Sequence, residues 1–441
     1  MGLLSLGIFF IGFVCFFTKH KSVTLVAIVL LSTSYFGFVR EFFYIGSVSL
    51  QHGDLALLLI FSLIPFKFTR NITELNGIRR SMILFFSFLF VSVCYDVVVR
   101  DISLGQVFRT VRHLGYFAFF FLIPRFKYSD YRAFLIFLLF STFFHGLIFL
   151  SQYLFGYSYS TNLILNEFGQ ARYGGSPVYL VVSIVILTVG ISKSAIAISF
   201  EKILLVLLIL AVVFSQSRGA IVSVIAVLFL QQYLKSSVHP VSIIAFLVTL
   251  LGVSYMVGLF FPIISERFSN IVPAINLAVD MDYGNLQAFF HEGSLLFRWG
   301  MTFERFVFVL EDPVRMLLGV GYMPDMDLSS LVFVLGTHSP MLPLGFEQYN
   351  SVDIFFPNII TRYGFLGSVL FLYMLWQFFK FSYCLRSTMW GKILYIYLIS
   401  MLVLSLVNES FYNGQKFFII FVLIGIIFQF NHISRLRENY N

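Results

Sequence analysis

Charged side chains are scarce in this sequence of 441 residues. Asp, Glu, Lys and Arg together make up 11% of it, whereas an ordinary soluble domain carries roughly 25%. Hydrophobic residues reach 59%, including 58 Phe and 23 Tyr. This composition excludes an ordinary soluble fold and favours a chain that places most of its length in a bilayer.

Cysteine is also rare, and the signatures of several protein classes are missing. Cys15, Cys94 and Cys384 form no CxxC pair, which argues against thiol redox chemistry or a metal cluster. The sequence has no GxxxxGK[ST] motif, so we expect no ATP-driven pump, and no HExxH motif, so we expect no catalytic metal and no cofactor. The net charge of +8 is spread over short loops, so nucleic acid is not an expected partner.

Apolar runs recur down the chain, each long enough to cross a hydrocarbon core of about 30 Å. The sequence therefore predicts an all-α, polytopic transmembrane bundle of about 12–13 spans with one long, partly helical loop. We assign residues 1–261 to helices 1–10, residues 262–353 to the loop, and residues 354–441 to helices 11–13 and a cytoplasmic tail. The predicted spans are 3–17, 22–39, 48–66, 81–99, 105–124, 133–155, 177–192, 201–215, 218–234, 241–261, 354–379, 390–407 and 416–430.

Lysine and arginine are unequally divided between alternate loops. One set of loops, which includes Lys21, Arg125, Lys235 and Lys392, carries 17 basic residues, and the opposite set carries nine. Short basic loops stay in the cytoplasm, so we expect the long loop to face outward and the C-terminus to face inward.

The long loop, residues 262–353, holds most of the acidic side chains of the protein. Its segment 294–310 places apolar residues in a mostly helical rhythm, which predicts a helix there. The segment 262–268 is short and amphipathic, and we expect it to lie in the membrane interface.

Several arginines lie at predicted helix ends near this loop. Arg218 lies in a tight turn between two oily helices and Arg172 in a Gly-rich link, whereas Arg109, Arg112 and Arg362 lie at the mouths of helices. A guanidinium near hydrocarbon is costly without a partner, and its planar fork suits pyrophosphate oxygens. The alternative is an interfacial anchor that reaches the headgroups. We favour a functional role for the first two and anchoring for the other three.

The long loop also holds the candidates for a general base. His338 is the best placed, because the ordinary pKa of histidine lies near neutrality, and the alternative is a loop histidine exposed to water. His291 is a weaker candidate. Alternative bases, or partners for the arginines, are Glu292, Glu304, Glu347 and Asp353. We expect His113 and His145, which lie in predicted helices, to be packed polar groups.

Four short sequence patches follow one another within and on either side of the long loop. They are Ala171-Arg-Tyr-Gly-Gly-Ser-Pro177, Ser215-Gln-Ser-Arg-Gly-Ala220, the run from Arg298-Trp to Leu318-Gly-Val-Gly321, and the run from Tyr349 to Gly367. Together, over about residues 105–430, they resemble the O-antigen polymerase and O-antigen ligase superfamily of bacterial inner membranes.

The resemblance implies a multi-pass glycosyltransferase of the bacterial inner membrane, with its active site facing the periplasm and a glycan on undecaprenyl pyrophosphate as donor. It implies that Arg218, then Arg172 and Arg298, meet the charge of the leaving pyrophosphate without a metal. His338 or Asp353 would act as base, and Arg109, Arg112, Glu347 and Arg362 are secondary site candidates. The implied partners are the lipid-linked oligosaccharide, membrane lipid and a chain-length-regulating co-polymerase.

Three activities fit this description to different degrees. In the ligase pattern an Asn closely follows the histidine, whereas here Asn350 comes twelve residues after His338. This departure favours a polymerase, with Asp353 before the next helix, over a ligase that moves finished glycan onto lipid A–core. A flippase or transporter for a lipid-linked sugar commonly shows two similar halves, which this sequence lacks.

Overall fold

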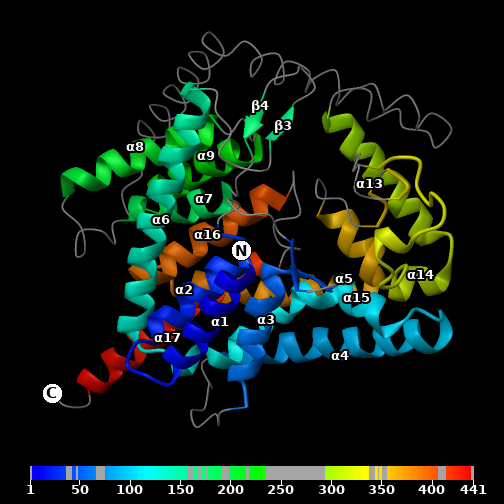
Figure 1. Cartoon of the computed structure of the whole chain (residues 1–441), viewed down its shortest axis with the longest axis horizontal. Coiled ribbons are helices and arrows are strands. Elements are labelled where there is room, and N and C mark those ends of the chain that lie inside the picture. The colour runs from blue at the N-terminus through cyan, green and yellow to red at the C-terminus, as the bar shows by residue number, and fades with distance from the viewer. Residues whose placement is uncertain are drawn as a thin grey trace.

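The computed structural model describes residues 2–35, 42–45, 48–65, 75–155, 163–165, 171–173, 177–189, 198–214, 218–234, 294–336, 343–345, 347–349, 355–405 and 414–438. These residues are mainly helical (Figure 1). The helices of the first half are α1 (Gly2–Phe16), α2 (Lys21–Ser32), α3 (His52–Leu63), α4 (Asn76–Val99), α5 (Leu104–Val111), the 3₁₀-helix η2 (Arg112–Arg125), α6 (Tyr128–Phe155), α7 (Pro177–Val189), α8 (Ile198–Phe214) and α9 (Arg218–Tyr233).

The second half of the chain continues in the same way. Its helices are α13 (Ser294–Leu310), α14 (Pro313–Leu318), the 3₁₀ turn η5 (Asp325–Asp327), α15 (Phe356–Cys384), α16 (Met389–Ser405) and α17 (Gly414–Glu438). Within the described residues two short antiparallel hairpins interrupt the helices: β1 (Phe42–Ile45) pairs with β2 (Val48–Gln51), and β3 (Leu163–Leu165) with β4 (Ala171–Tyr173).

Three of the described helices are long and apolar enough to cross a bilayer. They are α4, residues 128–152 of α6, and α15, and several shorter apolar helices pack around them. The predicted class, a helical membrane protein, is confirmed. The number of spans and the side of the membrane that the long loop faces stay predictions.

Helices α4 and α15 pack side by side in opposite directions. Phe85 of α4 meets Phe371 of α15 with ring centroids 5.2 Å apart. One turn towards the end of α4, Phe88 lies against Gly367, and near its start Gly77 lies against Gln377. The contacts therefore move up one helix as they move down the other, and the end of α4 lies beside the start of α15.

One end of the bundle, which we call the basic face, collects basic residues from loops far apart in sequence. Lys21 Nζ donates to the carbonyl of Arg125 at 3.0 Å, and Lys392 Nζ donates to the carbonyl of Leu234 at 3.4 Å. The charge count predicted that Lys21, Arg125 and Lys392 lie in loops on one side of the membrane. The two contacts agree with that prediction.

We call the end of the bundle away from the basic face the opposite face. The start of α9 lies there. Ser223 Oγ of α9 donates to the carbonyl of Ser400 at 2.9 Å, and Lys392 meets Leu234 further along, so α9 and α16 are antiparallel. Only residues 385–388 separate α15 from α16, and the two helices pack together. The starts of α9 and α15 therefore lie at the same end of the bundle.

The predicted span 105–124 is not a single α-helix. It divides into α5, which places Leu104 and Phe108 outward and Val107 inward, and the 3₁₀-helix η2. A 3₁₀-helix rises about 2.0 Å per residue, so the 14 residues of η2 cover roughly the thickness of the hydrocarbon core. This geometry lets a short segment connect Arg112 to Arg125, whose carbonyl accepts from Lys21 on the basic face.

Two other boundaries bear on the predictions. The predicted span 48–66 begins as strand β2, because a capping box of Gln51 and Asp54 starts α3 only at His52. The predicted helix at 294–310 is confirmed as α13. The predicted span 241–261 and the segment 262–268 lie outside the described residues.

Candidate functional site

The described part of the long loop is fastened to the start of α15 by a close backbone contact. Asp312 caps α14 by accepting from Val314 N at 2.8 Å, and α14 ends at Gly319, whose φ is +77°. Gly364, at φ +61°, kinks α15 at the same place. A Cβ on Gly364 would lie 2.7 Å from Gly319 N, so neither backbone leaves room for a side chain.

A buried ion pair at the end of α4 holds the next residues of the loop. Asp96 is fully buried, and its carboxylate accepts from Arg100 Nη1 at 2.8 Å and from Tyr322 N at 2.7 Å. Arg100 Nη2 donates to the carbonyl of Gly319 at 2.7 Å. Gly321 lies so close that a Cβ there would be 2.6 Å from Arg100 Nη1. Two glycines and an ion pair therefore fix the path of the loop over α4.

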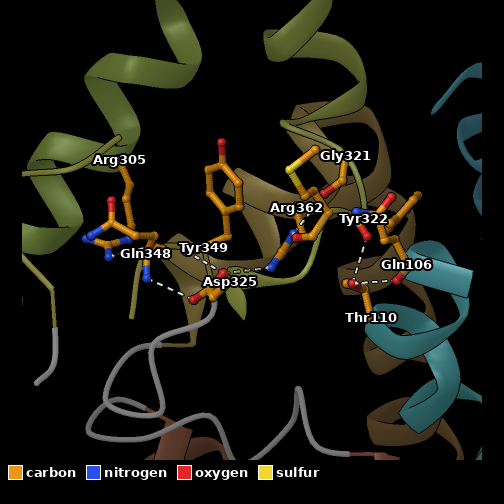
Figure 2. Close-up of polar contacts among 10 residues, drawn as sticks. Gln106, Thr110, Arg305, Gly321, Tyr322, Asp325, Gln348, Tyr349 and Arg362 are labelled. Atoms are coloured by element: carbon orange, nitrogen blue, oxygen red, sulfur yellow. Dashed lines mark hydrogen bonds and ion pairs between the residues drawn. The ribbon is translucent and has the colours of Figure 1, made fainter. Parts of the chain in front are cut away.

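Arg362 holds the same loop from the side of α15 (Figure 2). Its side chain is fully buried. Nη1 donates to the carbonyls of Gly321 at 2.9 Å and Met323 at 2.7 Å, and Nη2 donates to Asp325 Oδ1 at 3.3 Å. The guanidinium also lies over the ring of Tyr349, 4.9 Å from its centroid. The structure shows that this secondary candidate holds the loop against α15, and its role in the site stays a prediction.

Asp325 joins two parts of the loop that are 23 residues apart in the sequence. Its carboxylate accepts from Gln348 N at 2.8 Å and Tyr349 N at 3.1 Å. The Gln348 side chain in turn accepts from Val332 N at 2.8 Å and Phe333 N at 2.7 Å. A polar group this deeply buried is stable only when it is fully hydrogen-bonded, and these bonds meet that requirement.

The triplet Asp325-Met-Asp327 has the Asp-x-Asp pattern that can also bind divalent cations, and the sequence analysis did not single it out. In the structure both carboxylates have protein partners: Asp325 bonds to Arg362, and Asp327 Oδ2 lies 3.1 Å from Arg109 Nη2. The triplet therefore has a structural use. A second triplet, 280–282, lies outside the described residues.

Two neighbouring charged residues of α13 hold the far part of the loop. Arg305 is fully buried, and it donates to the carbonyl of Leu335 at 3.2 Å and to that of Gln348 at 2.8 Å. Glu304 accepts from Val334 N at 2.6 Å and Leu335 N at 3.0 Å. Burial lowers the pKa of Arg305 to about 10, so it stays charged at neutral pH. Burial raises the pKa of Glu304, and its two backbone bonds partly offset that rise.

We call the charged side chains that hold residues 319–349 the loop clamp. They are Asp96, Arg100, Glu304, Arg305, Asp325 and Arg362. Of these, the sequence analysis proposed a site role only for Arg362 and Glu304. A signal for Asp96 was present, since it is a carboxylate inside an apolar run with Arg100 four residues later. Arg305 gave no such signal, because most of its acceptors are backbone carbonyls far away in sequence.

The other secondary arginines have carboxylate partners. Arg109 pairs with Asp327 at an exposed position, and Arg112 Nη1 lies 3.0 Å from both oxygens of Asp54. Thr110, between them, donates to the carbonyl of Tyr322 at 2.7 Å. These contacts fasten α5 to the loop and to α3, and the predicted anchoring of both arginines to lipid headgroups stays a prediction.

The structure describes three of the five residues predicted for the main site, Arg298, Arg218 and Arg172. Arg298 is half-buried in α13, seven residues before Arg305 and so on the same face of that helix. Arg218 is the first residue of α9, and Arg172 lies in β4 with Ile164 as its cross-strand partner. His338 and Asp353 lie outside the described residues, and Glu347, half-buried, precedes Gln348.

The start of α9 has the partial positive charge common to helix N-termini. The first N–H groups of a helix have no partner within it, and the helix dipole adds partial positive charge at that end. In this chain a guanidinium-bearing residue, Arg218, stands at that position, at the same end of the bundle as the loop clamp. Phosphate groups bind readily at such helix starts.

No protein-family model and no curated protein matches the chain. The fold and the clamp define the class as a helical membrane protein in which charged side chains hold the described loop residues at one end of the bundle.

Proposed function

We propose that this protein is a surface-polysaccharide polymerase of the bacterial inner membrane. It transfers a growing glycan from undecaprenyl pyrophosphate to the next lipid-linked repeat unit, at the periplasmic side. The resemblance of four sequence patches to the O-antigen polymerase and ligase superfamily suggests the reaction. The contacts between residues 318–321 of one patch and residues 349–367 of another support reading them as parts of one site.

The observation that carries the proposal is the position of Arg218 at the first residue of α9. Pyrophosphate is a polyanion, and it must leave from a site that hydrocarbon partly surrounds. The helix start supplies N–H donors, and the arginine supplies a full positive charge. In a site with little water, the loss of one such donor costs a few kcal/mol of barrier.

The proposed reaction is a displacement at the anomeric carbon. A hydroxyl oxygen of the acceptor sugar bonds to that carbon while its bond to the pyrophosphate oxygen breaks. The proton of the hydroxyl passes to a base, His338 or Asp353, and the electron pair leaves with undecaprenyl pyrophosphate. Arg218, with Arg172 and Arg298, neutralises the leaving group without a divalent metal.

The loop clamp has a positioning role in this proposal. His338 follows Leu335, whose carbonyl and N–H bond to Arg305 and Glu304, by three residues. Asp353 precedes the buried Phe355 by two residues. Each candidate base is thus within three residues of a buried residue, Leu335 or Phe355, and we propose that the clamp helps to position His338.

The glycan made by cells without the protein tests the proposal. Core carrying a single repeat unit on a gel is the result we expect, because a polymerase is then missing. Bare core together with long lipid-linked chains would instead assign the ligase reaction. Core without any attached repeat unit, and without long lipid-linked chains, would indicate a flippase. Normal polymer would refute all three activities. Re-expression of the wild-type chain should restore the ladder.

A further inference from the structure

A groove of about 310 Å³ lies between α3, α4 and η2. Its lining is almost wholly apolar and includes Phe61 of α3, Ile83 and Phe86 of α4, and Phe121 of η2. Arg79 of α4 also lines it. None of these residues belongs to the loop clamp, so this groove is separate from the site proposed above.

The 3₁₀ geometry of η2 explains why the groove exists. Side chains three residues apart eclipse one another in a 3₁₀-helix, which aligns Gly115, Ala118 and Phe121 in one row. The first two are small, so the row leaves space beside α4. A Cβ on Gly115 would lie 3.1 Å from Leu57 and 3.2 Å from Phe61, so larger side chains there would press on α3.

The one charged residue among the described residues that line the groove, Arg79, lies at its basic-face end. Arg79 is exposed in the first turn of α4, and the nearby Gly77 packs on Gln377 near the end of α15. The start of α4 also carries partial positive charge from its dipole. An apolar groove with an arginine at one end suits a molecule that has an acyl chain and an anionic head group.

We propose that this groove binds an anionic phospholipid from the leaflet at the basic face. One acyl chain lies between α4 and η2, and the phosphate is held by Arg79. The acyl chain gains no hydrophobic free energy by moving from the bilayer into an apolar groove, because both surroundings are hydrocarbon. The groove therefore does not distinguish one lipid tail from another. Selectivity for an anionic head must therefore come from Arg79, as in basic pockets between transmembrane helices. The proposal is independent of the glycan chemistry.

Native mass spectrometry of the purified full-length protein tests this site. The probes are phosphatidylglycerol and phosphatidylcholine with identical acyl chains. We expect the wild type to retain phosphatidylglycerol in preference to phosphatidylcholine, and Arg79→Gln to reduce that preference about fivefold. Ile83→Trp, which fills the groove from an exposed position, should lower retention of both lipids.

Two matched variants serve as controls. Arg80→Gln and Leu84→Trp alter exposed neighbours on the same turns that do not line the groove, and both should bind like the wild type. The proposal is overturned if the wild type shows no preference, if Arg79→Gln keeps it, or if Arg80→Gln loses as much. Size-exclusion profiles matching the wild type establish that each variant is folded.

Discussion

Gly319 and Gly364 lie backbone to backbone where α14 ends against the kink of α15. Both have positive φ, and a Cβ on Gly364 would lie 2.5 Å from the carbonyl of Leu317. We expect Gly364→Ala to separate the loop from α15, because the variant adds a clash to a backbone strain of about 1–2 kcal/mol. Polymer should shorten or disappear while the protein still reaches the membrane.

Gly345→Ala separates these two effects. Gly345 has a φ of +73° and nothing within 4 Å of its Cβ position, so this variant has the strain without the clash. We expect nearly normal polymer from it, as judged on the same gels. Equal damage from both variants would mean that strain alone is responsible and that the close contact has no special importance.

Arg362→Lys tests the loop clamp. A lysine carries the charge but cannot reproduce two guanidinium nitrogens that reach the carbonyls of Gly321 and Met323 and the carboxylate of Asp325. Each buried acceptor that is left without a donor costs about 1–3 kcal/mol. The loop 319–349 should become sensitive to limited proteolysis in membranes, and polymer should be lost.

The matched control is Arg109→Lys. Its pair with Asp327 is half-exposed, and exposed pairs contribute about 0–1 kcal/mol. This variant should keep the proteolytic pattern and the polymer of the wild type. A protected loop in Arg362→Lys would show that the buried contacts do not hold it.

Glu304 gives the loop a predicted pH dependence. Burial raises the pKa of this carboxyl in the folded protein, so the folded state favours its protonated form. The stabilising contribution is complete below the ordinary pKa of a glutamate and is lost as pH rises through the raised one. We expect Glu304→Gln to weaken the fall in melting temperature between pH 4 and pH 7, measured in detergent.

Glu311→Gln is the control for that measurement, because it removes an exposed carboxylate just after the same helix. It should leave the pH dependence close to that of the wild type. The assignment to Glu304 fails if the two variants behave alike.

The proposed chemistry also predicts that chelators do not inhibit. Guanidinium groups and a helix start supply the positive charge, so EDTA should leave polymer formation by the purified protein unchanged. A metal-dependent glycosyltransferase assayed in parallel shows that chelation is effective. Activity that falls with EDTA and returns with Mg²⁺ would replace the arginine-based mechanism with a metal-based one.

The apolar runs and the charge distribution in the sequence predicted the positions of several helices. The sequence predicted spans at 81–99 and 354–379, and the structure has α4 at Asn76–Val99 and α15 at Phe356–Cys384. It also grouped Lys21 with Arg125, which are in contact. Long oily runs and short basic loops are local signals, so they can be read without knowledge of the tertiary contacts.

The departures have non-local causes. The segment 105–124 divides at Arg112, which bonds to Asp54, 58 residues away, and η2 then continues as a 3₁₀-helix. The clamp could not be predicted in detail, since Arg305 bonds to carbonyls 30 and 43 residues further on. Hydropathy does not report which backbone carbonyl a buried arginine will meet.

The most direct test of the account compares Arg218→Ala and Arg218→Lys in cells that lack the native protein. Glycan ladders are measured at membrane levels matched to the wild type. We predict that Arg218→Ala leaves core with a single repeat unit, and that Arg218→Lys keeps partial polymer because the charge remains. Near-normal chain length in Arg218→Ala would contradict the claim that this arginine at the start of α9 neutralises the leaving pyrophosphate.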